Sequence, residues 1–406
     1  MQFRHFFIII LFSCFFIISC RDSDKIASIE REDLFTLDIG KLEDQIALFN
    51  NEGDMGIPRM DIAMRNGLFY ISDGNGGKIL RYNSYGDLLF MIYNEETNPP
   101  PMTLKPLVDG NLVTRWAVSY PLLQPGLIAV DSRKHIYVVD RLPYERHSFD
   151  TENKALLDSV ILHFDGDGRF VEYLGREGIG GSPFPRVEKI YTNLKEDLVV
   201  VCRLPNGWNI YWYDSEGTFL FVVQLKTELI PIPPDREDVI SSLDKITAGP
   251  DDRTLFVKVD YYRHTYDGST NIRTGIEPDS SVIWIMNAEE GIWVKYLETP
   301  FFEYTVTEQN RQNRTKMLYS LLGVARHGQV VLMFPVEEGY SILVLSSETG
   351  AQADQTRGFI RVDDEELQFN VFDLSADGII SGLLADEWQV KLVWWRTDKI
   401  LGDGSK

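Results

Sequence analysis

The chain of 406 residues is 44% hydrophobic, 12% aromatic and 25% charged, which excludes a disordered polymer, a collagen-like repeat and a multi-span membrane protein. Forty Lys and Arg residues against 61 Asp and Glu residues give a net charge of −21, and no stretch of sequence forms a strong basic patch. Such an acidic chain repels phosphate backbones. We therefore expect a folded protein with no nucleic-acid partner.

Residues 1–19 have the pattern of an export signal. A short positive start that includes Arg4 precedes the apolar run FFIIILFSCFFII, which is too short to cross a bilayer comfortably. The sequence therefore predicts a cleaved signal peptide. The alternatives are an ordinary secretory signal followed by an incidental cysteine and an uncleaved anchor.

A cysteine directly follows this segment. The tetrad IISC that ends at Cys20 resembles the lipobox of bacterial lipoproteins, in which the cysteine receives diacylglycerol and becomes the new N-terminus. A rival box ending at Cys14 would leave only FFIIIL as the apolar core, so we assign lipidation to Cys20. Residues 20–32 are then a flexible tether, and two or more acyl chains give stable anchoring. The resemblance implies an exported protein, anchored by lipid to a bacterial envelope membrane and facing the periplasm or the cell surface.

From residue 33 onward, short runs of β-branched and aromatic residues recur in a fixed order, with no long segment of helical period between them. The first of six copies contains MDIAM, LFYISD, KILRYN and DLLFMIY, with a turn at Gly86. The corresponding turns of the next four copies fall at Gly168, Gly217, Gly291 and Gly350. Glycine supplies the positive φ that such a turn needs. Four antiparallel strands make one blade, and blades bury their faces only against neighbours, so the copies are expected to close into a ring.

The sixth copy ends without a convincing outer strand. The run LFTLDIG at residues 34–40 has the character of an outer strand and stands unpaired at the other end of the chain. We expect it to complete the last blade, which closes the ring and removes an exposed edge. The predicted fold class is all-β, a single six-bladed β-propeller over residues 33–402. A seven- or eight-bladed ring and a pair of sandwiches are the alternatives.

Two of these copies carry a family resemblance. The segments MDIAMRNGLFYISDGNGGKILRYNSYGDLL and LIAVDSRKHIYVVD resemble the NHL-type six-bladed propeller, whose repeat runs as I-A-V-D, then I-Y-V-x-D, then I-x-x-F/Y-D-x-x-G. The export signal, the lipobox and the acidic propeller together are similar to lipoproteins of this build in spirochaetes. The resemblance implies a cellular location and a fold, but it implies no activity.

The loops between the second and third strands of each copy are expected to emerge on one face. Two of them, residues 141–159 and 261–281, are long, and long loops in compact domains are often functional. Each carries a Tyr, an Arg and a His, and two Trp residues of other copies can join them. The candidate partner-binding residues are Tyr144, Arg146, His147, Trp208, Tyr262, Arg263, His264 and Trp388. The set suits recognition of a protein or a glycan, and the alternative is loop residues that pack over their own blades.

Sequence patterns that indicate catalysis are weaker than those that indicate binding. NHL-type propeller lyases use a histidine-bound metal, but our strand assignment places only His147 and His264 on a shared face. The sequence offers no aligned Glu, Asn and Asp set for a channel calcium, no G-x-S-x-G and no phosphate loop. We therefore expect a monomeric binding or scaffolding protein without a cofactor, whose partners are the lipid bilayer and an envelope protein or glycan. A metal-dependent propeller hydrolase or lyase of the lactonase kind is the alternative.

Four local features complete the expectations. Short helices are predicted from Glu308 to Leu322 and from near Asp235, and the PPP-containing link at residues 94–125 is expected to cap one face. Cys202, within the apolar run LVVVC, is expected to be a buried and inert thiol.

Overall fold

The computed structural model describes residues 26–401, except residues 50–58, 108–113, 235, 309–310, 348–354, 363 and 365. The expected signal peptide, Cys14, Cys20 and the turn at Gly350 therefore lie outside the described residues. Within the described part, the regular structure is strand apart from four short 3-10 helices, and no helix there is long and apolar enough to cross a membrane. These helices are η1 (Tyr144–Arg146), η2 (Thr227–Leu229), η3 (Arg326–Gly328) and η4 (Thr397–Ile400). The all-β expectation is confirmed.

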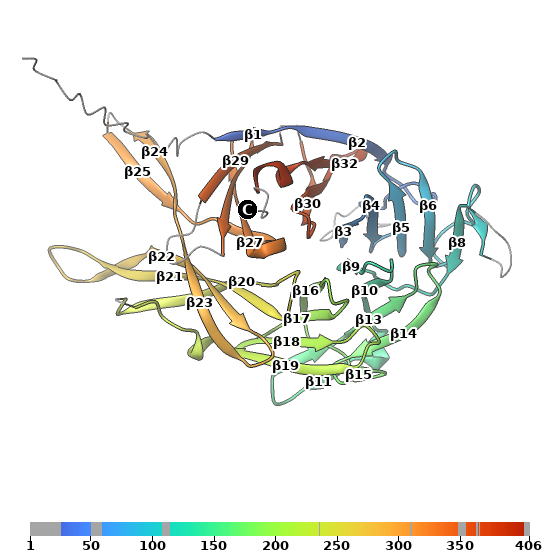
Figure 1. Ribbon diagram of the computed structural model, residues 1–406, viewed down its shortest axis with the longest axis horizontal. Coiled ribbons are helices and arrows are strands. Elements are labelled where there is room, and N and C mark those ends of the chain that lie inside the picture. Colours follow the sequence, from blue (N-terminus) through green and yellow to red (C-terminus); the bar gives the residue numbers. More distant parts are fainter. Residues whose placement is uncertain are drawn as a thin grey trace, which may run out of the picture.

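The strands form a β-propeller, with sheets arranged in a ring (Figure 1). In the described residues, six of the sheets contain four or more strands. The third and fourth strands of the first four sheets are joined by turns whose glycines all have positive φ, as predicted. These are Gly86, Gly168, Gly217 and Gly291, with φ of 83°, 81°, 77° and 67°.

The first three sheets follow the chain in order from the inner strand outward, except that β8 lies between β6 and β7 in the first sheet. The first sheet contains β3 (Met60–Arg65), β4 (Leu68–Asp73), β5 (Lys78–Asn83), β6 (Leu88–Tyr93), β8 (Trp116–Ser119) and β7 (Lys105–Pro106). The second contains β9 (Ile128–Val130), β10 (Ile136–Arg141), β13 (Ser159–Phe164), β14 (Phe170–Gly175) and β15 (Gly178–Ile179). The third contains β16 (Val187–Thr192), β17 (Leu198–Leu204), β18 (Gly207–Tyr213) and β19 (Phe219–Lys226).

The last two of the remaining three sheets also take in strands from the N-terminal end of the described chain. The fourth sheet contains β20 (Val239–Ala248), β21 (Thr254–Tyr266), β22 (Arg273–Asn287) and β23 (Ile292–Thr299). The fifth contains β26 (Ser320–Ala325), β27 (Gln329–Val336), β28 (Gly339–Ser346), β29 (Gln355–Arg361) and β1 (Ala27–Ile29). The sixth contains β30 (Phe369–Leu374), β31 (Ile380–Ala385), β32 (Gln389–Trp395) and β2 (Arg31–Asp38). Two separate hairpins are formed by β11 (Ser148–Asp150) with β12 (Ala155–Leu157), and by β24 (Phe302–Glu308) with β25 (Arg311–Met317).

The N-terminal strand closes the ring, as the sequence predicts. β2 pairs antiparallel with β32, from Arg31 opposite Trp395 to Asp38 opposite Gln389. Leu37 of β2 is buried in the core cluster that joins the sixth sheet to the first. β1 pairs in parallel with β29 of the fifth sheet, so this short N-terminal stretch spans two neighbouring sheets. In Figure 1 the blue strands β1 and β2 lie beside the orange and red strands β29 and β32.

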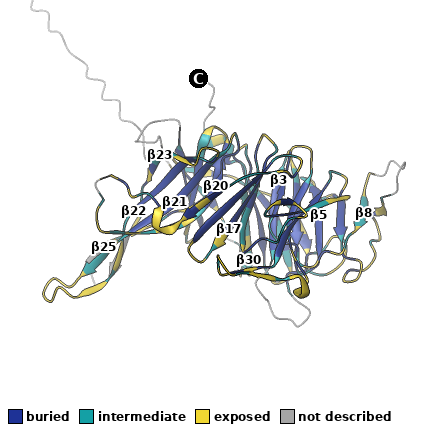
Figure 2. Ribbon diagram, turned by 90° about the horizontal axis from the view of Figure 1, so that it is seen from below, coloured by how far each residue is buried: buried dark blue, intermediate teal, exposed yellow. Residues whose placement is uncertain are grey.

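The hydrophobic core lies between the sheets. Each of the six core clusters in the described residues joins two sequential sheets, and one of them joins the sixth to the first. The strands of the ring are accordingly mostly buried, whereas the end of the projecting β21–β22 hairpin, residues 266–274, is exposed (Figure 2). Cys202 is fully buried in the cluster between the second and third sheets, and this burial raises the pKa of its thiol well above the usual value. The expectation of a buried thiol is confirmed.

Three local expectations are wrong. The segment from Glu308 to Leu322 is not a helix, because β24 pairs with β25 as a hairpin and β26 follows. Its first part, residues 308–316, is entirely polar and has no apolar stripe of helical period that could pack on the ring. Asp235 lies outside the described residues, and β20 begins only a few residues later at Val239, where a helix was expected. The link at residues 94–125 adds β7 and β8 to the edge of the first sheet, β8 running parallel to β6, instead of capping a face.

Candidate functional site

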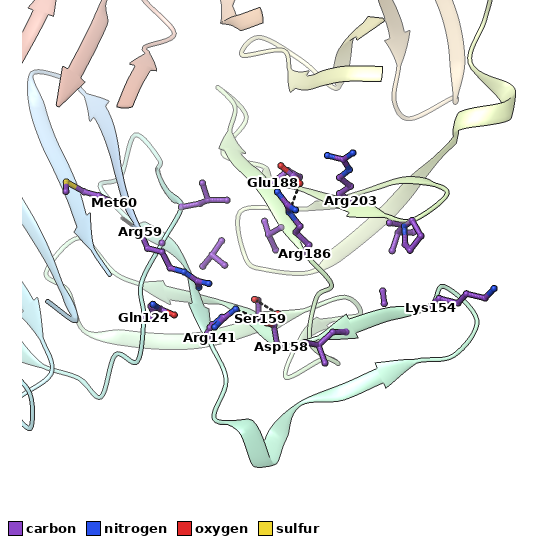
Figure 3. Close-up of a pocket in the computed structure, with 18 residues that line it drawn as sticks. Arg59, Met60, Gln124, Arg141, Lys154, Asp158, Ser159, Arg186, Glu188 and Arg203 are labelled. Carbon is purple, nitrogen blue, oxygen red and sulfur yellow. Dashed lines mark hydrogen bonds and ion pairs between the residues drawn. The ribbon is translucent and has the colours of Figure 1, made fainter. Parts of the chain in front are cut away.

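A pocket of about 790 Å³ lies at one end of the inner strands β3, β9 and β16, beside the β11–β12 hairpin. We call it the mouth pocket (Figure 3). Its charged lining consists of five cations and two acids, in a chain whose net charge is −21. The cations are Arg59, Arg141, Lys154, Arg186 and Arg203, and the acids are Asp158 and Glu188.

Strand ends bring these arginines together. Arg59 directly precedes β3, and Arg186 directly precedes β16. Arg141 is the last residue of β10, and Arg203 lies near the end of β17. Because the second strand of a sheet runs antiparallel to the inner one, its end returns to the face where the inner strands begin. Three sheets therefore present their arginines at the same end of the ring.

The positive charge of the mouth pocket is only partly balanced. Arg141 Nη2 lies 3.6 Å from Asp158 Oδ2, and Arg186 Nε lies 2.8 Å from Glu188 Oε1. Arg59 makes no ion pair with any described residue, and burial together with the charge of Arg141 lowers its pKa. In Figure 3 the guanidinium of Arg59 extends toward that of Arg141.

These contacts leave forked cations available to an anion. Guanidinium groups bind carboxylates and phosphates through paired N–H donors. The uncharged walls of the pocket are largely aliphatic, and no aromatic ring is among the lining residues. The aliphatic residues include Met60, Leu127, Val139, Leu156, Val187 and Leu204.

A second cavity, of about 350 Å³, is lined by residues of all six inner strands, β3, β9, β16, β20, β26 and β30. We call it the axial cavity. Met60, Leu127 and Glu188 line both this cavity and the mouth pocket, so the two spaces adjoin.

Six charged residues line the axial cavity: Asp61, Arg65, Glu188, Lys189, Lys245 and Asp373. Two of them are well paired. Lys189 Nζ lies 2.8 Å from Asp61 Oδ2, and the backbone N–H of Ile128 donates to the same carboxylate at 3.2 Å. Burial opposes the charge of Lys189, but the carboxylates of Asp61 and Asp373 raise its pKa above the usual range.

Asp373 and Lys245 have no ionic partner within 4 Å in the described part of the chain. Asp373 Oδ2 accepts one hydrogen bond, from the backbone N–H of Met64 at 3.1 Å. Lys245 Nζ donates one, to the backbone oxygen of Leu322 at 3.1 Å. Each group therefore keeps hydrogen-bonding capacity that the described side chains do not use.

The pKa values of these two groups reflect the same isolation. Burial raises the pKa of Asp373 to about 6, with Lys189 opposing the shift and Asp61 reinforcing it. Burial and the positive charge of Lys189 lower the pKa of Lys245 to about 8. Strongly perturbed groups that face a cavity are typical of binding and catalytic sites.

The candidate residues of the second sheet lie outside the mouth pocket. Tyr144 in η1 is 83% exposed, and the guanidinium of Arg146 lies 5.8 Å from the centre of the Tyr173 ring. His147 Nε2 is 2.9 Å from the backbone oxygen of Leu142. The long loop at residues 141–159 thus contains η1 and the β11–β12 hairpin, and it is the hairpin that reaches the pocket.

The candidate residues of the fourth sheet are in a strand. Tyr262, Arg263 and His264 belong to β21, which pairs with β22 as far as Tyr266 opposite Arg273. The sequence predicted a loop at residues 261–281, and this prediction is wrong for most of that length. The residues continue β21 and β22, and the pairing of these strands satisfies their backbone groups. Arg263 Nη2 lies 2.9 Å from Asp279 Oδ1. The two Tyr, Arg and His sets stand on the second and fourth sheets, with the third sheet between them.

The two tryptophans differ in exposure. Trp208 is buried at the start of β18, and the guanidinium of Arg203 lies 5.4 Å from its ring centre. Trp208 also lines a neighbouring cavity together with Lys154 and Leu204, which both reach the mouth pocket. Trp388, between β31 and β32, is 78% exposed. Of the eight candidates, Trp208 is the one that adjoins the arginines.

The expected distribution of histidines is wrong. His135 Nδ1 lies 2.9 Å from His163 Nε2, and His163 Nδ1 lies 3.2 Å from Glu172 Oε1. These histidines meet because β13 is antiparallel to β10, which places His163 opposite Tyr137, two residues from His135. Burial lowers the pKa of His163. Across the part of the chain that the structure describes, no group of three or more His, Cys, Asp or Glu residues is arranged to hold a metal ion.

The arginines of the mouth pocket and the charges of the axial cavity escaped the sequence-based prediction. They are widely spaced, and none forms a motif with its neighbours. Their one shared pattern is that each arginine lies beside a strand terminus, either before an inner strand or at the end of a second strand. That pattern gains meaning only once the strand order is known.

No family model and no curated protein sequence matches the chain. Solved structures similar to it include the WD40 domain of coronin from Toxoplasma gondii, with 8% identity, a TM-score of 0.41, and coverage of 93% of this chain and 88% of that one. The β-propeller domain of the Trilobed protease from Pyrococcus furiosus has 9% identity, a TM-score of 0.38, and coverage of 86% and 97%. A polysaccharide lyase described as an ulvan lyase has 13% identity, a TM-score of 0.40, and coverage of 89% and 84%.

Proposed function

We propose that this chain is a lipid-anchored protein of the bacterial envelope whose propeller binds an acidic peptide segment of another envelope protein in the mouth pocket. The anchoring is supported by the tetrad that ends at Cys20 and by the apolar run before it. The binding role is supported by one observation above all, the excess of cations in a concave pocket of a strongly acidic chain.

The walls of the mouth pocket favour a peptide over a glycan. Sugar rings commonly stack on aromatic side chains, and the pocket has none among its lining residues. Aliphatic side chains such as Leu156 and Val187 suit the apolar residues of a peptide, while Arg59 and Arg141 suit its carboxylates. The pocket of about 790 Å³ has room for a few residues of such a segment.

Titration calorimetry with the purified protein and a synthetic peptide of alternating Glu and Leu tests this function. A matched peptide with Gln in place of Glu isolates the contribution of the carboxylates. We expect the Glu peptide to bind at least about tenfold more tightly than the Gln peptide, a difference of about 1.4 kcal/mol. Arg59→Ala should remove most of that difference, whereas Arg326→Ala, outside the mouth pocket, should leave it unchanged.

Equal binding of the two peptides would contradict the proposal, since carboxylate recognition would then be absent. Polygalacturonate, an acidic glycan, serves as the competitor. If it bound through Arg59 while the Glu peptide did not, the pocket would still recognise anions, but the peptide assignment would be wrong.

A further inference from the structure

We propose that the axial cavity binds a small zwitterion of the α-amino acid type, with the ammonium group of the ligand at Asp373 and its carboxylate at Lys245. This ligand differs from the one assigned to the mouth pocket, and the inference does not depend on it.

The pairing within the cavity carries the inference. Asp61 and Lys189 satisfy each other at 2.8 Å, so neither needs a ligand. Asp373 and Lys245 have opposite charges, line the same space and make one hydrogen bond each, both to backbone groups. A carboxylate has acceptor sites for several donors and an ammonium has three N–H groups, so both have capacity left for a ligand.

Electrostatics selects a ligand that carries both charges. Removing an unpaired charge from water is costly, and a partner of opposite sign offsets that cost. A simple anion can neutralise Lys245 but leaves Asp373 as before, and a simple cation does the reverse. The six charged residues of the cavity lining are three acids and three cations and sum to zero, so a ligand that is itself neutral overall and dipolar preserves the balance while pairing both groups.

Size and access are consistent with such a ligand. The axial cavity, at about 350 Å³, falls at the lower end of the range of small-molecule sites. Met60 and Leu127 line both this cavity and the mouth pocket, so the two spaces adjoin on that side. The backbone oxygen of Leu322 and the backbone N–H of Met64 hold the two charged side chains in place.

Three small probes separate this inference from simpler ones. L-alanine carries both charges, propionate lacks its ammonium group, and ethylamine lacks its carboxylate. In titration calorimetry with the full chain near pH 7, we expect L-alanine to bind at least about tenfold more tightly than either fragment. The other proteinogenic amino acids, measured in the same way, would then define which side chain fits the remaining space.

Two variants place the binding at the proposed residues. Asp373→Asn and Lys245→Met should each weaken amino acid binding by about tenfold or more, while the exposed control Lys105→Met should leave it unchanged. Thermal unfolding of each variant confirms that it is folded, and Lys245→Gln replaces the methionine variant if that one fails to fold. The inference is overturned if none of the amino acids binds with a Kd below about 10 mM, if propionate or ethylamine matches alanine, or if the folded variants bind as the parent does. Binding of the acidic peptide in the mouth pocket is a separate readout that these results leave unaffected.

Discussion

Asp61 and Lys189 form an ion pair, 2.8 Å from Oδ2 to Nζ, between the inner strands β3 and β16, which belong to the first and third sheets. The inner strand of the second sheet, β9, lies between them in the ring and donates the Ile128 N–H to the same carboxylate. One carboxylate thus ties three sheets together inside the axial cavity.

Removing the cation of this pair should destabilise the protein strongly. Lys189→Met leaves the carboxylate of Asp61 buried without a counter-charge, which costs about 3–5 kcal/mol. The double variant Asp61→Asn with Lys189→Met should recover much of that loss, because no unpaired charge is left. Urea unfolding followed by tryptophan fluorescence measures the free energy of unfolding of both variants. A single variant as stable as the parent would show that the pair contributes nothing to stability.

The stability of the protein should depend on pH through Asp373. Its folded pKa of about 6 lies above the ordinary Asp value of 3.8, so the folded state holds the proton more tightly than the unfolded state. Stability therefore decreases as pH rises from about 4 to about 6. Asp61, Lys189 and Lys245 face this group, and their charges contribute to the shift of its pKa. Asp373→Asn should flatten this part of the pH profile and raise stability at pH 7 by about 1–2 kcal/mol.

Lys245 gives the complementary dependence at high pH. Its folded pKa of about 8 lies below the ordinary Lys value of 10.5, so the unfolded state binds the proton more tightly. Stability attributable to this group rises as pH increases from about 8 to about 10.5. The neighbouring charges are Lys189, Asp244, Asp61 and Asp373. Lys245→Met should remove this rise in stability. Chemical unfolding of the variant at several pH values in this window measures it, and a rise that persists would contradict the prediction.

Neutralising an acid of the mouth pocket should strengthen anion binding. Asp158 lies 3.6 Å from Arg141 and competes with a bound carboxylate for that guanidinium. A partly exposed pair is worth up to about 1 kcal/mol, so Asp158→Asn should tighten binding of the Glu and Leu peptide by about two- to fivefold. The control is Asp377→Asn, which removes the partner of Arg326 outside the pocket. Weaker binding by the Asp158 variant would argue against competition.

Closure of the ring should depend on Leu37. This side chain is buried between β32 and the first sheet, and truncation of a buried leucine costs about 2–5 kcal/mol. Leu37→Ala should lower the urea midpoint, and limited proteolysis should begin near β2. The neighbouring Thr36 is exposed in the same strand, so Thr36→Ala is the matched control and should change little.

Membrane association should depend on Cys20. If this thiol carries the lipid, Cys20→Ser should move the protein from the detergent phase to the aqueous phase in Triton X-114 partitioning, because the acyl chains supply the anchoring. Cys202→Ser is the control, since that thiol is buried in the core. A Cys20 variant that still partitions with detergent after signal cleavage would place the anchor elsewhere.

Much of the fold is readable from the sequence because propeller blades are encoded locally. Short β-branched runs specify the strands, and Gly86, Gly168 and Gly217 specify turns that other residues would adopt only with strain. The closing strand was recognisable because the last copy lacked an outer strand and residues 34–40 had no other partner. The polar segment near Glu308 misled the helix prediction, because its residue types tolerate a helix as readily as an exposed hairpin.

The site was not readable in the same way. Arg59, Arg141 and Arg186 acquire a common environment only when three sheets are placed side by side. Asp373 and Lys245 likewise come together only in the folded ring, because they belong to different sheets. Neither forms a functional motif with its neighbours in the sequence. The loop residues chosen from sequence were selected for their chemistry, but strand pairing placed Tyr262 and Arg263 in an extended hairpin instead.

The division of the N-terminal stretch between β29 and β32 has a mechanical consequence. A pulling force applied at residue 26 acts first on the three-residue strand β1. It acts on the longer strand β2 only after β1 has separated from its sheet. The short pairing of β1 with β29 thus protects the closing pair of β2 and β32 from a force applied at this end of the described chain.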